Sequence, residues 1–224
     1  MEIQHQTVFL AFGGFAMRTF KRILGLSLLT LGLFTMGAGM GAAQSQEVAI
    51  DGDHGKLSAV IQRPAGKTEY PLVIIMHGFM ANKERPLLTK LADDLEKDGI
   101  ASIRFDFNGQ GQSEGRFQDM TVVNEIEDAK RLCLCTELPG VTSIALAGHS
   151  QGGVVASMTA GELGTQKVKA LVLMAPAAVL REDAIRGQIF GVTMIPSIRR
   201  EIIDVRDHKV GAAYVKTAQT LPIY

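Results

Sequence analysis

The sequence has only two cysteines and no net charge at neutral pH, and each of these features excludes a class of protein. With 23 basic and 23 acidic side chains and no basic patch, the chain lacks the electrostatic surface that nucleic-acid binding requires. Cys133 and Cys135 stand two positions apart in a helical pattern and point to different faces, so we expect free thiols. No cysteine–histidine cluster has metal-ligand spacing, and we expect neither a metal nor another cofactor.

The apolar run at residues 23–36 is shorter than the roughly 20 residues that a membrane-spanning helix needs. Basic residues precede this run and small residues follow it, which is the order found in a secretory signal peptide. We expect residues 1–43 to be that signal, with cleavage close to Gln44 and a secreted or periplasmic protein free of the membrane. Met17, directly before the basic residues, is an alternative start, and an uncleaved anchor is the competing interpretation.

The most informative segment is residues 144–153, in which an apolar run meets Gly148-His149-Ser150-Gln151-Gly152 and a helix-compatible run follows. This strand–turn–helix context is typical of a nucleophile elbow, in which a serine occupies a sharp, strained turn. Gly148 and Gly152 would relieve crowding around that turn, and Ser150 is the predicted nucleophile. The structural alternative is a serine that only caps the helix.

A second Gly-x-Ser-x-Gly pattern occurs at residues 111–115, but its context differs from that of the elbow. Residues 108–110 separate it from the preceding strand pattern, and a polar stretch follows it. We therefore interpret Ser113 as a loop residue and not as a nucleophile.

Strand and helix patterns alternate along most of the chain after residue 43. Expected strands lie at residues 47–51, 56–63, 71–76, 100–107, 144–147 and 168–174, and expected helices at 84–98, 122–134 and 154–161. This alternation predicts an α/β fold, a mostly parallel sheet with helices on both faces, with its core at residues 44–176. Residues 177–221 carry many charges and no buried-strand run, and we expect an inserted cap over the C-terminal edge of the sheet.

Taken together, these segments resemble the α/β-hydrolase superfamily and, within it, the bacterial cinnamoyl and feruloyl esterases. The matching pieces are His77-Gly78-Phe79, residues 106–115, residues 148–153, Ala175-Pro176-Ala177-Ala178 and residues 214–224. The resemblance implies an oxyanion hole formed by the backbone N–H groups of Phe79 and Gln151. It also implies a small-molecule ester substrate, with Asp183 and Tyr214 holding the phenolic ring of a hydroxycinnamate.

The chain departs from this family after the cap, because the segments that carry the triad acid and histidine have no counterpart. His208 is the one histidine that follows Ser150, and we expect it to be a solvated cap residue. His77 and His149 precede the serine, whereas the base of this fold follows it, so we expect both to shape loops. The resemblance thus implies a C-terminally truncated esterase that lacks its last strands and leaves residues 168–174 as an open edge.

Three functions remain open from the sequence. The first is a secreted serine carboxylic ester hydrolase that forms an acyl-enzyme at Ser150, with this chain inactive because nothing deprotonates the serine. The second is a peptidase or an acyltransferase, since a fold does not fix its reaction, and the third is a non-catalytic binding module. The sequence gives no indication of an oligomeric state.

Overall fold

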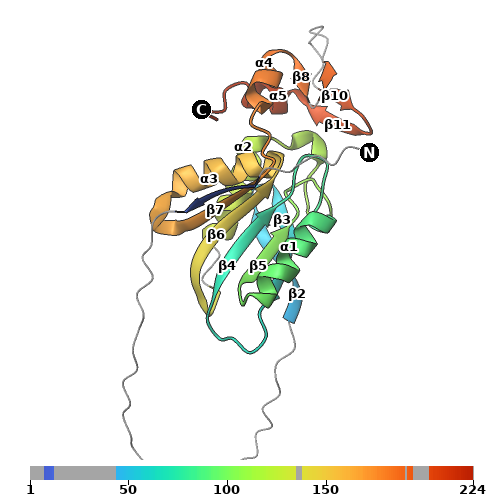
Figure 1. Cartoon of the computed structure of the whole chain (residues 1–224). Coiled ribbons are helices and arrows are strands. Elements are labelled where there is room, and N and C mark those ends of the chain that lie inside the picture. Colours follow the sequence, from blue (N-terminus) through green and yellow to red (C-terminus); the bar gives the residue numbers. More distant parts are fainter. Residues whose placement is uncertain (1–7, 13–43, 135–137, 190, 194–201, 224) are drawn as a thin grey trace, which may run out of the picture.

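The computed structural model describes residues 8–12, 44–134, 138–189, 191–193 and 202–223 (Figure 1). The predicted signal segment after residue 12 and Cys135 lie outside these ranges. Cys133 is a buried free thiol, and burial raises its pKa to about 11. Within the described ranges, no helix has the length and apolar character needed to cross a membrane.

A seven-stranded sheet forms the centre of the described structure, in the order β1-β7-β6-β4-β5-β3-β2. Its strands are β1 (Val8–Phe12), β2 (Gln44–Gly52), β3 (Gly55–Arg63), β4 (Tyr70–Met76), β5 (Ala101–Phe105), β6 (Val141–His149) and β7 (Val168–Met174). The four neighbours β5, β4, β6 and β7 run parallel, and the flanking strands pair antiparallel. The predicted hairpin at the start of the core is β2–β3, and the predicted parallel centre is confirmed.

Helices cover both faces of the sheet (Figure 1). On one face, α1 (Pro86–Lys97) packs Leu88 and Ala92 against Val73 and Ile75 of β4. The other face carries α2 (Val122–Leu134) and α3 (Gln151–Lys167), whose buried side chains share a core with Leu72, Ile74 and Met76. Successive side chains of β4 thus pack into the cores on opposite faces of the sheet, because side chains alternate between the faces along a strand. This explains why the sequence of β4 is apolar without interruption.

Strand β7 is not an open edge, because β1 pairs with it antiparallel from Val8 opposite Met174 to Phe12 opposite Ala170. The prediction of an unpaired edge at residues 168–174 is wrong for this structure. The physical reason for the difference is that β1, a strand upstream of the apolar run at residues 23–36, pairs with one side of β7. The backbone groups of β7 are therefore paired on both sides.

The described residues after Pro176 form a layer beyond the C-terminal ends of the parallel strands (Figure 1), and we call residues 177–221 the cap segment. It contains α4 (Leu180–Ile185), β8 (Gln188–Ile189), β9 (Val192–Thr193), β10 (Ile202–Val205), β11 (His208–Gly211) and α5 (Ala212–Ala218). Val205, Val210 and Tyr214 are buried and belong to the same core as the sheet. The cap segment is therefore packed onto the core over part of its surface.

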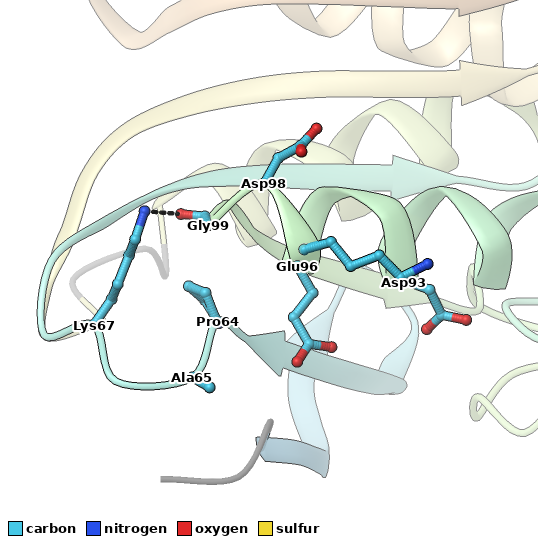
Figure 2. Close-up of a pocket in the computed structure, with 8 residues that line it drawn as sticks. Pro64, Ala65, Lys67, Asp93, Glu96, Asp98 and Gly99 are labelled. Carbon is cyan, nitrogen blue, oxygen red and sulfur yellow. Dashed lines mark hydrogen bonds between the residues drawn. The ribbon is translucent and has the colours of Figure 1, made fainter. Parts of the chain in front are cut away.

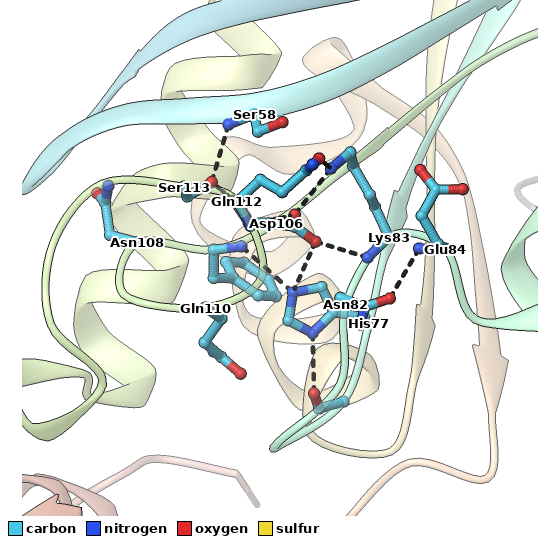
Figure 3. Close-up of polar contacts among 12 residues, drawn as sticks. Ser58, His77, Asn82, Lys83, Glu84, Asp106, Asn108, Gln110, Gln112 and Ser113 are labelled. Atoms are coloured by element: carbon cyan, nitrogen blue, oxygen red, sulfur yellow. Dashed lines mark hydrogen bonds and ion pairs between the residues drawn. The ribbon is translucent and has the colours of Figure 1, made fainter.

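A buried ion pair fastens the loop that follows β4 to the loop that follows β5 (Figure 3). The Lys83 ammonium lies 2.9 Å from Asp106 Oδ2, and the two side chains are only 2% and 1% exposed. The backbone N–H groups of Lys83 and Gln112 also donate to this carboxylate, at 2.6 and 2.9 Å. Asp106 is thus the shared acceptor that holds both loops.

Ser113 belongs to the same arrangement (Figure 3). Its hydroxyl donates to the Asp106 carbonyl at 2.6 Å and accepts the Ser58 N–H at 2.8 Å. The second Gly-x-Ser-x-Gly pattern is therefore a loop fastened to β3, in agreement with the interpretation from its sequence context.

Replacing Asp106 with Asn should lower the free energy of unfolding by about 3–5 kcal/mol, because the Lys83 ammonium would stay buried without its counter-charge. Urea denaturation at pH 7 measures the loss. The matched control is Asp119→Asn, which removes the exposed pair with Arg116 and should cost less than about 1 kcal/mol. Equal, small losses in both variants would contradict the role assigned to Asp106.

Candidate active site

Ser150 stands alone between the end of β6 and the start of α3, with a φ of 55° and a ψ of −121°. A positive φ is uncommon for a residue that carries a Cβ and marks a strained turn. The Ser150 N–H donates to the Met174 carbonyl at 3.1 Å, and the Ala177 N–H donates to the Ser150 carbonyl at 3.0 Å. These two bonds tie the turn to the end of β7 and to the start of the cap segment.

The turn is as crowded as its glycines indicate. A Cβ on Gly148 would lie 2.1 Å from the Gly152 carbonyl oxygen, and a Cβ on Gly152 would lie 2.3 Å from the His77 carbonyl oxygen. Both approaches are to backbone atoms, which cannot swing aside. Neither position can therefore take a side chain without displacing β6, α3 or the loop after β4.

The loop after β4 lies directly against the serine. A Cβ on Gly78 would stand 2.9 Å from Ser150 Cβ and 3.4 Å from its Oγ. Phe79 follows, and its ring packs against the rings of Phe117 and Tyr214, with centroids 5.5 and 5.4 Å apart. The structure thus places both residues predicted to donate to an oxyanion near Ser150. Gln151 follows Ser150 in the sequence, and Phe79 follows Gly78, which lies against the serine.

A cavity of about 160 Å³ opens beside Ser150 under the cap segment. It is lined by Ser150, Ala177, Val179, Leu180, Asp183, Ala184, Gln188, Ile189 and Tyr214. Most of the wall is apolar, and a few polar side chains stand in it, as in sites that orient a small ligand. The two predicted substrate-binding residues, Asp183 and Tyr214, therefore share one cavity with the predicted nucleophile.

Tyr214 is also the outer end of a buried chain of hydrogen bonds. Its hydroxyl donates to Gln151 Oε1 at 2.6 Å, and Gln151 Nε2 donates to Glu125 Oε2 at 2.7 Å. Gln110 Nε2 donates to the other oxygen of Glu125, also at 2.7 Å. Burial raises the pKa of Glu125 to about 8.

Sequence reasoning missed Glu125, which belongs to no motif. A signal was present, because Glu125 lies on α2 between the buried Val122 and Ala129, on the apolar side of that helix. A carboxyl group at such a position must find hydrogen-bond partners inside the protein, and such groups are frequent at functional sites.

Both ring nitrogens of His77 are hydrogen-bonded to backbone groups. His77 is 1% exposed, donates from Nδ1 to the Gly78 carbonyl at 2.8 Å and accepts the Phe107 N–H at Nε2. Burial lowers its pKa to about 4, and burial also lowers the pKa of His149. In the described part of the chain, no side chain hydrogen-bonds to the Ser150 hydroxyl.

His208 lies on β11 and does not line the Ser150 cavity. Its ring packs against Phe117, with centroids 4.6 Å apart, and its Nδ1 is buried without a hydrogen-bond partner. His208 is half-buried, so the cap residue expected to be solvated is only partly so, because the Phe117 ring covers one side of the imidazole.

A larger groove, of about 530 Å³, lies at the opposite end of the sheet, where β4 and β5 begin (Figure 2). It is lined by Pro64, Ala65, Lys67, Asp93, Glu96, Lys97, Asp98 and Gly99. Lys67 donates to the Gly99 carbonyl at 3.2 Å, and both Asp93 and Glu96 accept from Gln62. No serine, threonine or cysteine lines this groove, and none of the described residues form a group of three or more His, Cys, Asp or Glu side chains able to hold a metal ion.

Comparison with known proteins identifies the family to which the chain is similar. Residues 67–214 match the family described as serine aminopeptidase, S33. The solved structure of Est1E from Butyrivibrio proteoclasticus with bound ferulic acid is similar at a TM-score of 0.74 and 32% identity. That likeness covers 79% of this chain and 72% of Est1E.

Two curated relatives match shorter segments. An Escherichia coli protein of the traX-finO intergenic region is 30% identical over 117 residues, which are 49% of this chain and 38% of that protein. The quorum-quenching protein AidA of Acinetobacter baumannii is 31% identical over 85 residues, 38% of this chain and 28% of AidA. The matches thus span less than half the length of each relative.

The family match covers well over half of the chain and contains the Ser150 turn, the loop at Phe79 and the cavity residues Asp183 and Tyr214. The resemblance to α/β-hydrolases inferred from the sequence is confirmed by this match and by the likeness to Est1E. The chain belongs to the serine aminopeptidase S33 family of α/β-hydrolases.

Proposed function

We propose that this protein is a serine carboxylic ester hydrolase that acts on hydroxycinnamate esters of the feruloyl type. The observation that carries the proposal is that Ser150, on its strained turn, opens into the same cavity as Asp183 and Tyr214. The similarity to Est1E, whose structure holds ferulic acid, supports the class of substrate.

In the proposed reaction the Ser150 oxygen attacks the ester carbonyl carbon, and the serine proton passes to a base. The carbonyl oxygen then carries a negative charge, which the main-chain N–H groups of Phe79 and Gln151 stabilise by roughly 3 kcal/mol each. Collapse of this intermediate breaks the bond to the alcohol, which leaves with a proton. Water then cleaves the acyl-enzyme and releases the acid.

The cavity favours a ligand that donates a hydrogen bond. The Tyr214 hydroxyl donates its hydrogen bond to Gln151, so toward a ligand its oxygen can only accept a hydrogen bond. The Asp183 carboxylate also accepts hydrogen bonds. A phenolic hydroxyl can donate to these two acceptors, and the apolar walls suit the aromatic ring and its propenoyl chain.

An aminopeptidase is the second candidate, because that activity is in the description of the matched family. An amino-acid p-nitroanilide compared with a ferulate ester separates the two. If Ser150-dependent turnover is higher for the anilide, the result favours the peptidase. If it is higher for the ester, the result favours our proposal.

We expect the 224-residue chain to hydrolyse p-nitrophenyl acetate only slightly faster than Ser150→Ala, because no described side chain contacts the hydroxyl as a base. Added imidazole should raise the Ser150-dependent rate about tenfold, less than the 10²-fold or more that a positioned base contributes. Rates of both proteins are compared at each imidazole concentration, which subtracts hydrolysis in solution.

Two outcomes would contradict this expectation. Fast Ser150-dependent turnover without imidazole would mean that the chain holds a base, with His208 the first residue to replace. No Ser150-dependent turnover even with imidazole would favour the non-catalytic binding module.

Asp183→Ala should weaken binding of methyl ferulate about 5- to 150-fold, the equivalent of a lost buried hydrogen bond worth ~1–3 kcal/mol. Binding of methyl cinnamate, which lacks the phenolic hydroxyl, should hardly change. Isothermal titration calorimetry gives both affinities, and Asp207→Ala, an exposed position in the β10–β11 turn, is the matched control. Equal losses for the two esters would mean that Asp183 only supports the cap segment.

We also propose export through the leader at residues 1–43, with a mature chain that begins at or near Gln44. Cleavage there would remove β1 and leave β7 unpaired on one side. The intact mass of exported protein decides the matter, and a mature chain that still contains residues 23–36 would exclude this leader.

A further inference from the structure

The carboxyl group of Glu125 is the inner end of the hydrogen-bond chain behind Ser150. Both of its oxygens accept from amide groups, one from Gln110 and one from Gln151. Glu125 is only 2% exposed, so water does not compete for these bonds.

When Glu125 is ionised, the partners of Gln151 leave its carboxamide only one orientation. A carboxylate can only accept, so the amino group of Gln151 must face Glu125 and its carbonyl oxygen must face Tyr214. Tyr214 in turn must point its hydrogen at Gln151, so its oxygen is left to accept, and Tyr214 is one of the residues that line the Ser150 cavity. The acceptor role of Tyr214 is therefore set at Glu125, two hydrogen bonds away.

We propose that Glu125 is a positioning residue that, through the Gln151 carboxamide, holds the Tyr214 hydroxyl as an acceptor toward the Ser150 cavity. The same anchor fixes Gln151, the first residue of α3, whose main-chain N–H is the expected oxyanion donor. The role in selecting a phenolic ester rests on the proposed function, whereas the link from Glu125 to Tyr214 stands on the contacts alone.

The same link can also form when Glu125 is neutral. Gln110 Oε1 is buried without a partner, so turning that amide over would let it accept the proton of a neutral Glu125. The other oxygen of Glu125 would still accept from Gln151. In that arrangement, ionisation of Glu125 changes the charge behind Tyr214 and leaves the hydrogen bond from Tyr214 to Gln151 in place.

Few other charges face Glu125. Asp128, on the same helix, raises the pKa of Glu125 further by repulsion, and burial raises the pKa of Asp128 itself to about 6. A small cavity beside Glu125 is also lined by the charged or titratable side chains of His54, Arg116, Asp119 and Asp128. From α3 and α5 the facing groups are the neutral Gln151 amide and the Tyr214 hydroxyl, whose pKa is raised by burial and by the Glu125 charge.

Tyrosine-ring ¹³C NMR tests the link without a ligand, because the chain has only three tyrosines and Tyr214→Phe assigns the signal. The Cζ resonance of Tyr214 should shift in one step with a midpoint near pH 8, as the carboxyl group behind it ionises. The step should vanish in Glu125→Gln and persist in Asp128→Asn. A Tyr214 signal that is flat in the unaltered protein, or an unchanged step in Glu125→Gln, would overturn the proposal.

Ligand binding tests the consequence. In Glu125→Met the Gln151 carboxamide is free to turn over, so the preference for methyl ferulate over methyl cinnamate should fall at least about fivefold, as for one lost buried hydrogen bond. Glu125→Gln should keep the preference. The matched control Glu127→Met changes a partly exposed carboxylate on the same helix and should also keep it.

The two experiments separate the two proposals. In a Tyr214→Phe background, Glu125→Met should cause no further loss of preference, because its effect passes through Tyr214. A preference retained in Glu125→Met would overturn the positioning role. If the unaltered protein shows no preference for the ferulate ester, the proposed substrate fails, and the NMR titration still decides whether Glu125 controls Tyr214.

Discussion

The left-handed backbone of Ser150 is the constraint on which the rest of the site depends. A residue with a side chain at a φ of 55° costs of order 1–3 kcal/mol, so the surroundings must enforce it. They do so through backbone contacts that leave no room for a Cβ at Gly148, Gly152 or Gly78, and through the two hydrogen bonds to Met174 and Ala177. The end of β6, the loop after β4 and the start of the cap segment are thereby fixed relative to one hydroxyl group.

The cap segment and the core share one polar chain and one aromatic cluster. Tyr214 on α5 reaches Glu125 on α2 through Gln151, and its ring also packs against Phe79. The residue proposed to recognise the substrate is thus coupled to both residues proposed to stabilise the oxyanion. Substitutions within this set should not act additively, since residues that share partners in one network rarely do.

The features that could be predicted from the sequence are local. The Ser150 turn is formed by consecutive residues, and β4 is a continuous apolar run because its alternate side chains enter two different cores. The Glu125 network escaped prediction because its bonds join residues 26 and 63 positions apart, on elements whose packing no local pattern specifies. The strands β1 and β7, which pair with each other, are also far apart in the sequence. The strands β8 to β11 are only two to four residues long, too short to show the alternation of apolar and polar residues that predicts a strand.

The same geometry separates a nucleophile from a serine that merely caps a helix. A capping serine has an extended backbone, and its side-chain oxygen accepts a hydrogen bond from an N–H group of the first turn. Ser150 instead has a positive φ and no side-chain hydrogen bond to α3. A strained conformation, three glycines in close contact and an unused hydroxyl would be unfavourable for stability alone. Their combination is accounted for if the hydroxyl is kept open to the cavity that it shares with Asp183 and Tyr214, and this supports the assignment of Ser150 as the nucleophile.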